Sequence, residues 1–158
     1  MHQREEIDDQ RVAEKVSGAK RAAVHQALTR LSEFGIIERV RRGRRCHNTI
    51  KFSQAWVLPL KIASNLLELQ PIIDELKPIA TKIVLFGSRA HGTNDETSDF
   101  DLAVIASDKI TVERIVHAHA LAEHIQLILK NEGEMLELKD REPVFFKQIK
   151  EGIIVWEQ

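Results

Sequence analysis

Residues 83–105 decide the fold of most of the chain, and they read IVLFGSRAHGTNDETSDFDLAVI. Residues 83–86 form a short apolar run, which is typical of a buried strand. The glycine-bounded segment 87–92 follows, and a polar loop then leads to Asp99 and Asp101 at the start of a second apolar run. The pattern predicts two strands joined by a glycine turn, a short helix and a loop that ends at two aspartates.

The residue types in this segment favour phosphate chemistry. Gly87 and Ser88 lie between the expected strand and helix, where backbone amides and a hydroxyl form a good phosphate site. Asp99 and Asp101 are two residues apart on an expected strand, so their side chains point to the same face. Two carboxylates this close repel each other unless a cation lies between them, and such oxygen ligands suit Mg²⁺. A phosphate site facing a metal pair is the minimum for phosphoryl or nucleotidyl transfer.

The string GSRAHGTNDETSDFDL, residues 87–102, resembles the signature of the DNA polymerase beta-type nucleotidyltransferase superfamily, and in particular its small, minimal members in bacteria and archaea. The resemblance covers residues 73–156. It implies a mixed sheet flanked by helices, a nucleoside triphosphate as substrate and Mg²⁺ as cofactor. By the same resemblance, the nucleotide is expected to contact Gly87, Ser88 and Arg89, while the metal ligands and catalytic residues are Asp99 and Asp101.

The superfamily usually adds a third carboxylate on a neighbouring strand. The pattern IQLI at residues 125–128 is similar to the VDLV usual in that strand, which puts Gln126 where an aspartate belongs. A glutamine is neutral and cannot take a proton from a hydroxyl near pH 7. An alternative alignment makes EMLELKD, residues 134–140, the strand and offers Glu134 or Glu137 instead. We prefer the first alignment, because residues 132–140 are charge-rich and favour a short helix.

The N-terminal third has a different pattern. Apolar positions at helical spacing predict one short helix over residues 9–16 and a longer one that ends near 34–35, with a break at Ser17-Gly18. Residues 36–40 then indicate a strand, the sequence RRGRR at 41–45 a turn, and residues 46–52 a returning strand.

This order of helices and strands resembles the winged helix-turn-helix family, although the usual first helix is missing. The resemblance places the second helix in the major groove of double-stranded DNA and the hairpin along the phosphate backbone. The residues expected to contact DNA are Lys20, Arg21, His25, Gln26, Arg41, Arg42, Arg44 and Arg45.

Charge also divides the chain. Its 158 residues have a net charge of −1, but the segment up to Ser53 carries +5 and the remainder −6. We therefore predict an α+β protein with a winged helix at 1–53, a linker helix at 54–72 and a minimal nucleotidyltransferase domain at 73–158. Pro59 and Pro71 predict two helical pieces or a kink in the linker, because proline disrupts a helix interior.

These patterns lead to two hypotheses about function. The first is Mg²⁺-dependent transfer of a nucleoside monophosphate from a nucleoside triphosphate to an acceptor hydroxyl, which a partner protein could carry. The alternative is a DNA-binding regulator whose degenerate nucleotidyltransferase fold senses a nucleotide. A single cysteine, Cys46, and the lack of a long apolar run favour a cytoplasmic location without a membrane partner. A homodimer is compatible with an open triphosphate site.

Overall fold

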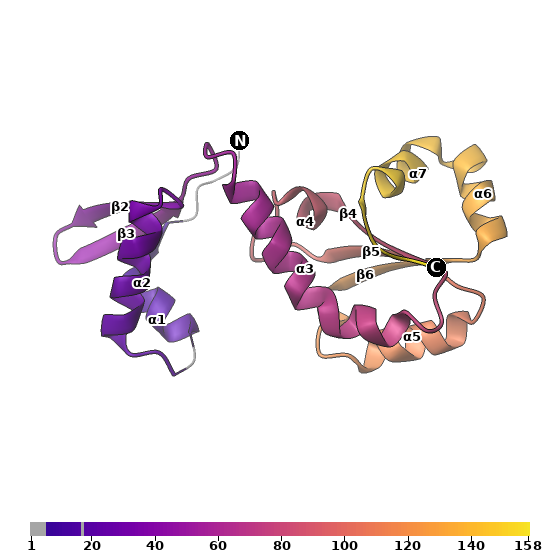
Figure 1. Ribbon diagram of the computed structural model, residues 1–158, viewed down its shortest axis with the longest axis horizontal. Helices are drawn as coiled ribbons and strands as arrows, with labels where there is room; N and C mark the ends of the chain where they lie inside the picture. The colour runs from indigo at the N-terminus through magenta and orange to yellow at the C-terminus, as the bar shows by residue number, and fades with distance from the viewer. Residues whose placement is uncertain (1–5, 17) are drawn as a thin grey trace. The chain divides into compact units, whose positions relative to one another are not determined.

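The computed structural model describes residues 6–16 and 18–158. The chain divides between Val57 and Leu58 into two compact units, and each is described by itself. Figure 1 shows the first unit in indigo and purple and the second from magenta to yellow. In the described ranges, no helix is both long and apolar enough to cross a membrane.

The first unit pairs two helices with a three-stranded antiparallel sheet, as the α+β prediction requires. The strands are ordered β1-β3-β2, and the hairpin of β2 and β3 pairs Ile37 with Ile50 at one end and Arg42 with Arg45 at the other. Its elements are β1 (Ile7–Asp8), α1 (Asp9–Lys15), α2 (Arg21–Glu33), β2 (Ile37–Arg42) and β3 (Arg45–Ile50).

Local signals explain these boundaries. The Asp8 carboxylate accepts the backbone N–H groups of Gln10 and Arg11 and so caps α1. Gly43 has φ +63° at the hairpin tip, a conformation that glycine adopts without strain. The predicted helices, strands and turn of this unit are therefore confirmed. Ser17, one of the two residues of the predicted break between the helices, lies outside the described residues. A small core holds the unit together and contains Val24, Leu28 and Ile37.

The second unit is built on a four-stranded mixed sheet of order β6-β5-β4-β7, in which β5 and β6 are parallel and the other pairs antiparallel. The helix α3 begins at the boundary between the units. The elements are α3 (Val57–Leu76), β4 (Lys82–Phe86), α4 (Gly87–His91), β5 (Phe100–Ile105), α5 (Lys109–Ala118), the 3₁₀ helix η1 (Ala122–His124), β6 (Ile125–Lys130), α6 (Glu132–Arg141), α7 (Pro143–Lys150) and β7 (Ile153–Glu157).

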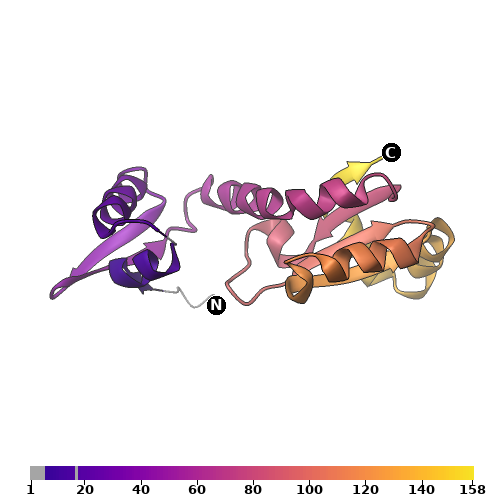
Figure 2. The same cartoon turned by 90° about the horizontal axis from the view of Figure 1, so that it is seen from below.

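Helices cover both faces of this sheet (Figures 1 and 2). Strand residues alternate between two apolar clusters because successive side chains point to opposite faces. One cluster joins Ile83 and Leu85 to α3 and α5, and the other joins Val84 and Phe86 to α6 and α7. The predicted mixed sheet flanked by helices is confirmed.

For the stretch predicted as two helical pieces or a kinked helix, the structure has one helix, α3, with Pro71 inside it. An interior proline costs about 3 kcal/mol. Burial of Leu69, Ile72 and Leu76, all fully inaccessible, offsets that cost, since each side chain contributes roughly 1.5–3 kcal/mol. The residues expected to act as a linker thus also form part of the core of the second unit. Between β5 and β6, the helix α5 ends at Ala118 and the 3₁₀ helix η1 follows.

Candidate active site

Gly87 touches the carboxylate of Asp101. The last residue of β4, Phe86, pairs with Asp101 across the antiparallel ladder, and Gly87 follows with φ +70°. A Cβ atom built on Gly87 would lie 2.0 Å from Asp101 Oδ2, far closer than atoms can approach. Only glycine fits, both by conformation and by space. The turn that begins α4 is therefore built directly against one of the two aspartates.

The two aspartates lie at the start of β5. Asp99 immediately precedes the strand and Asp101 is its second residue, half-buried. Burial raises the pKa of Asp101, and the negative charge of Asp99 raises it further. Both causes disfavour the ionised form of Asp101 beside the charge of Asp99. A bound cation would lower the pKa of Asp101 again, because it stabilises the carboxylate.

Gln126 lies on β6, the strand on the side of β5 opposite β4. In the parallel ladder of β5 and β6, Asp101 pairs with Gln126, whose side chain is exposed. Glu134 and Glu137 lie instead on α6, so the alternative alignment that made this segment a strand is wrong. Asn131 and Glu134 form a capping box, and Glu134 also pairs with Lys109. The Lys109 hydrogen bond is the main cause that lowers the pKa of Glu134.

A pocket of about 380 Å³ opens beside these residues. One wall comes from α7 and the residue after it, which bring Phe145, Gln148 and Glu151. No local motif marked them, because they lie 44 or more positions after Asp101 in a segment with an ordinary helical pattern. The pocket is lined by Phe86, Gly87, His91, Asp101, Gln126, Phe145, Gln148 and Glu151.

Two other expected nucleotide ligands lie outside the residues that line this pocket. Ser88 is half-buried in the first turn of α4, and its carbonyl oxygen accepts the N–H of Thr93 at 3.0 Å. The Arg89 side chain is only 11% exposed, and its guanidinium carbon lies 3.7 Å from the centre of the Phe100 ring. Arg89 Nε donates to the carbonyl oxygen of Ser98 at 2.9 Å. The guanidinium is thus engaged inside the protein.

The donor set fits Mg²⁺. Among residues 6–16 and 18–158, no group of three or more His, Cys, Asp or Glu side chains is arranged to hold a metal ion. Mg²⁺ does not need such a group, because it is commonly bound by one or two carboxylates together with substrate phosphates and water. Asp99 and Asp101 are two carboxylates of the kind that Mg²⁺ takes as ligands, and Asp101 lies directly against the Gly87 turn.

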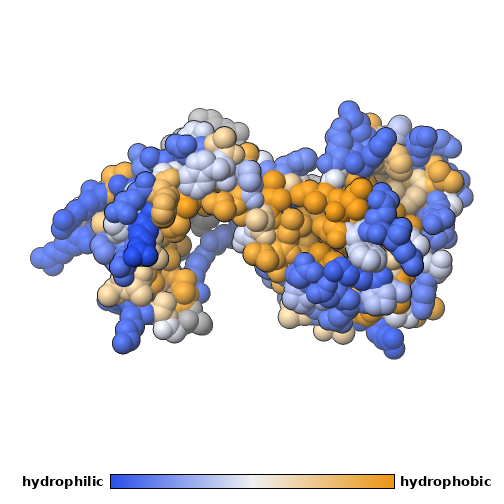
Figure 3. Space-filling view, in the orientation of Figure 1, coloured by the Kyte–Doolittle hydropathy of each residue, from blue (hydrophilic) through white to orange (hydrophobic). Residues whose placement is uncertain are grey.

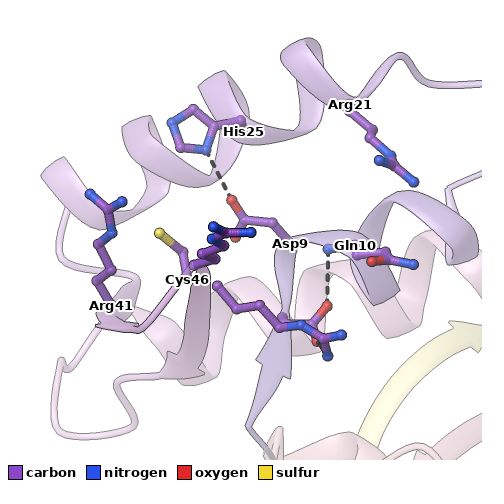
Figure 4. Close-up of a pocket in the computed structure, with 9 residues that line it drawn as sticks. Asp9, Gln10, Arg21, His25, Arg41 and Cys46 are labelled. Carbon is purple, nitrogen blue, oxygen red and sulfur yellow. Dashed lines mark hydrogen bonds and ion pairs between the residues drawn. The ribbon is translucent and has the colours of Figure 1, made fainter.

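A second pocket, of about 450 Å³, lies in the first unit between α2 and the basic hairpin formed by β2 and β3 (Figure 4). Five residues expected to contact DNA line it: Arg21, His25, Arg41, Arg44 and Arg45. Three others, Lys20, Gln26 and Arg42, are not among its lining residues. Lys20 lies at the N-cap position of α2, Gln26 is exposed on that helix, and Arg42 pairs with Glu6 at 2.9 Å.

The side chain that organises this pocket is Asp9, which sequence patterns did not mark. Its Oδ2 atom lies 2.9 Å from His25 Nδ1 and 2.6 Å from Arg39, and the first of these contacts is drawn in Figure 4. Asn48 donates to the other carboxylate oxygen at 2.8 Å. These partners are 16 to 39 positions away in the chain. Only the folded sheet brings them together.

The second unit has the nucleotidyltransferase fold. The profile of the family "Polymerase beta, Nucleotidyltransferase" matches residues 68–158, more than half of the chain, and the protein belongs to this family. Members of this family typically depend on Mg²⁺.

Two solved structures are similar to the chain. One, from Sulfolobus solfataricus and described only provisionally as a nucleotidyltransferase, has 20% identity and a TM-score of 0.45, covering 68% of this chain and 94% of the other. The second, a toxin–antitoxin with AMP-PNP, has 26% identity and a TM-score of 0.40, covering 60% and 74%. No curated protein gives a significant match.

Proposed function

We propose that the second unit transfers a nucleoside monophosphate from a nucleoside triphosphate to an acceptor hydroxyl, with release of pyrophosphate and of the hydroxyl proton to solvent and with Mg²⁺ as cofactor. The observation that carries this proposal is the contact of the Gly87 turn with Asp101, with Asp99 two residues away. A turn that requires glycine, built against paired carboxylates, brings backbone N–H groups that can bind a phosphate and oxygen atoms that can bind a metal to one place. Membership of the nucleotidyltransferase family supports the same chemistry.

Each residue has a separate task in this proposal. The backbone at Gly87 and the hydroxyl of Ser88 bind the triphosphate, and Asp99 and Asp101 hold Mg²⁺. The metal, when bound, neutralises phosphate charge and polarises the attacking and leaving oxygens. Gln126, beside Asp101, offers an amide that can hydrogen-bond the acceptor but cannot remove its proton.

Label transfer tests the proposal. The protein is incubated with ATP or GTP labelled at the α-phosphate, with Mg²⁺ and with protein, RNA or small-molecule acceptors. We expect transfer by the wild type and a loss of at least about 100-fold in D101N, because a neutral amide replaces a metal ligand. D140N, an exposed change on α6, is the matched control and should transfer normally. Equal activity in D101N and the wild type would contradict the assignment.

A second candidate function rests on the first unit. The sheet order β1-β3-β2, two helices and an arginine-rich hairpin favour a winged helix that binds double-stranded DNA. In that case the second unit, with Gln126 in place of an acid, would sense a nucleotide without transferring it. We expect duplex DNA affinity to fall steeply with salt if this is correct. Label transfer together with salt-insensitive or absent DNA binding would favour the first function.

A further inference from the structure

Arg89 holds the residues on both sides of Asp99. Its Nε atom donates to the carbonyl oxygen of Ser98 at 2.9 Å, and its guanidinium carbon lies 3.7 Å from the centre of the Phe100 ring. Ser98 precedes Asp99 and Phe100 follows it, with Phe100 fully buried. One side chain therefore fixes the main chain before the aspartate and the ring after it.

The side chain of Asn65, on α3, holds Arg89 in this position. It is only 5% exposed. Its Oδ1 atom accepts from Arg89 Nη1 at 3.3 Å, and its Nδ2 atom donates to the Arg89 carbonyl oxygen at 2.8 Å. The same Nδ2 donates to Asn94 Oδ1 at 3.1 Å, at the start of the loop that leads to Asp99. Asn65 thus links α3, Arg89 and the loop that leads to Asp99.

The loop has further supports of its own. Lys61, one turn before Asn65 on α3, donates to the carbonyl oxygen of Asn94. The Asp95 carboxylate accepts from the N–H of Thr97 at 2.9 Å and from its hydroxyl at 2.8 Å, and from the hydroxyl of Ser98 at 2.9 Å. These hydrogen bonds fix the conformation of the loop as far as Ser98, whose carbonyl oxygen accepts the hydrogen bond from Arg89.

We propose that Arg89 and Asn65 are positioning residues that set the place of the Asp99 carboxylate relative to Asp101 and the Gly87 turn. This inference rests on the proposed function, because it concerns the metal site of that reaction. The Arg89 side chain is 11% exposed, and its Nε and Nη1 atoms already have partners within the protein: the Ser98 carbonyl, the Asn65 amide and, at 3.7 Å, the Glu68 carboxylate. Arg89 therefore acts on the nucleotide through Asp99, and not by touching a phosphate.

Arginine suits this task better than lysine. Its planar guanidinium donates in several fixed directions and stacks on an aromatic face at the same time. A lysine ammonium is a point charge on a flexible chain and cannot meet the Ser98 carbonyl, the Asn65 amide and the Phe100 ring together. R89K should therefore keep the charge and lose the positioning.

Two measurements on R89K and N65A test the inference. The first is amide hydrogen exchange of residues 98–101 without metal or nucleotide. The second is the Mg²⁺ concentration that gives half-maximal ATP binding, compared with ATP affinity at saturating Mg²⁺. Matched controls are R141K, at an arginine 79% exposed on α6, and Q70A, at an exposed amide on α3.

We expect faster exchange at 98–101 in both variants and a rise of about tenfold or more in half-saturating Mg²⁺, the usual effect of losing a group that orients a metal ligand. ATP affinity at saturating Mg²⁺ should stay within about twofold, and both controls should match the wild type. If R89K does not fold, N65A decides alone, because it leaves the arginine in place.

Two results would overturn the inference. Unchanged exchange at 98–101 in the variants would show that Arg89 and Asn65 do not hold the segment. A loss of ATP affinity at saturating Mg²⁺ in R89K, with N65A unaffected, would mean that Arg89 contacts the phosphates directly. Failure of the proposed function looks different: the wild type then binds no ATP with Mg²⁺, while exchange at 98–101 still rises in the variants.

Discussion

The two units of this protein assemble their polar sites in opposite ways. In the second unit the glycine turn and the aspartate that it touches are 14 positions apart, directly after β4 and at the start of the adjacent strand β5. In the first unit Asp9 gathers partners that lie 16, 30 and 39 positions away on a helix and two strands. A site made by one hairpin-like segment can be recognised from its sequence, whereas a site made by the whole fold cannot.

Replacing Gly87 with alanine should have the largest effect. The new Cβ would lie 2.0 Å from Asp101 Oδ2 at φ +70°, so both the turn and the carboxylate must move. We expect loss of Mg²⁺-dependent nucleotide binding and a fall of at least about 2 kcal/mol in the free energy of unfolding. Denaturant unfolding and calorimetry measure the two effects.

The matched control for this change lies in the other unit. Gly43 has a similar φ of +63°, but no atom of the residues that the structure describes lies within 4 Å of the position of its Cβ. G43A should cost only the strain of the left-handed conformation, about 1 kcal/mol. Similar costs for both alanine variants would contradict the close contact of Gly87 with Asp101.

Replacing Gln126 with aspartate should raise transfer activity by about tenfold or more. The position adjoins Asp101, and a carboxylate there can accept a proton or a metal. Rates of label transfer measure the gain. Q148D, which adds a carboxylate to another wall of the same pocket, serves as the control and should give no such gain. An unchanged rate in Q126D would mean that this strand position does not complete the site.

Replacing Asp9 with asparagine should destabilise the first unit by about 1–3 kcal/mol. The change removes the charge that pairs with Arg39 and the carboxylate oxygen that contacts His25 Nδ1. ATP binding by the second unit should not change, because the unit 58–158 has its own core. Thermal unfolding and ATP titration of the same variant check both statements. A parallel loss of ATP binding would show that the two sites are coupled.

Stability should depend on pH through Asp101. Its pKa is raised above the ordinary value of 3.8 by burial and by Asp99, so the folded state favours the protonated form. The stabilisation is present below the unfolded pKa and is lost as the pH rises through the folded pKa. D101N should therefore be more stable than the wild type at neutral pH without Mg²⁺, with no difference at low pH. Melting curves across pH would contradict this if the wild type were the more stable at neutral pH.

The smallest expected effect concerns the basic hairpin. If it follows a DNA backbone, R44A should weaken duplex binding similarly for all sequences and lower the salt slope by about 1. Fluorescence titrations at several salt concentrations provide the slope. R114A, at an exposed arginine of α5, should leave the slope unchanged. Equal slopes in R44A and the wild type would remove Arg44 from the interface.

Much of the second unit was predictable because its signals are local. Apolar runs marked β4, β5 and β6, and the spacing of Gly87 and Asp101 marked the place where two of these strands meet. The wall from α7 was not predictable, since nothing in the sequence around Phe145 indicates which face of the sheet that helix covers. The direction of Arg89 was also hidden, because it depends on Asn65 from a helix expected to be a linker.

The exposed side of α3 is a further feature that the sequence did not predict. Leu60 and Leu67 have the helical spacing of core residues, yet they are 50% and 75% exposed, and Figure 3 shows hydrophobic side chains gathered over this helix. Leu69 and Ile72 on the same helix are completely buried. The sequence of an apolar helix does not say which of its sides meets the sheet, because both sides have the required periodicity.

The central claim is that Asp99, Asp101 and the Gly87 turn form a working site for a metal and a nucleotide. Calorimetric titration of ATP and GTP into the wild type and into D99A/D101A, each with and without Mg²⁺, tests it most directly. We predict binding that requires Mg²⁺ in the wild type and is lost in the double variant. Absence of binding by the wild type under every condition, or equal binding by the double variant, would contradict the claim.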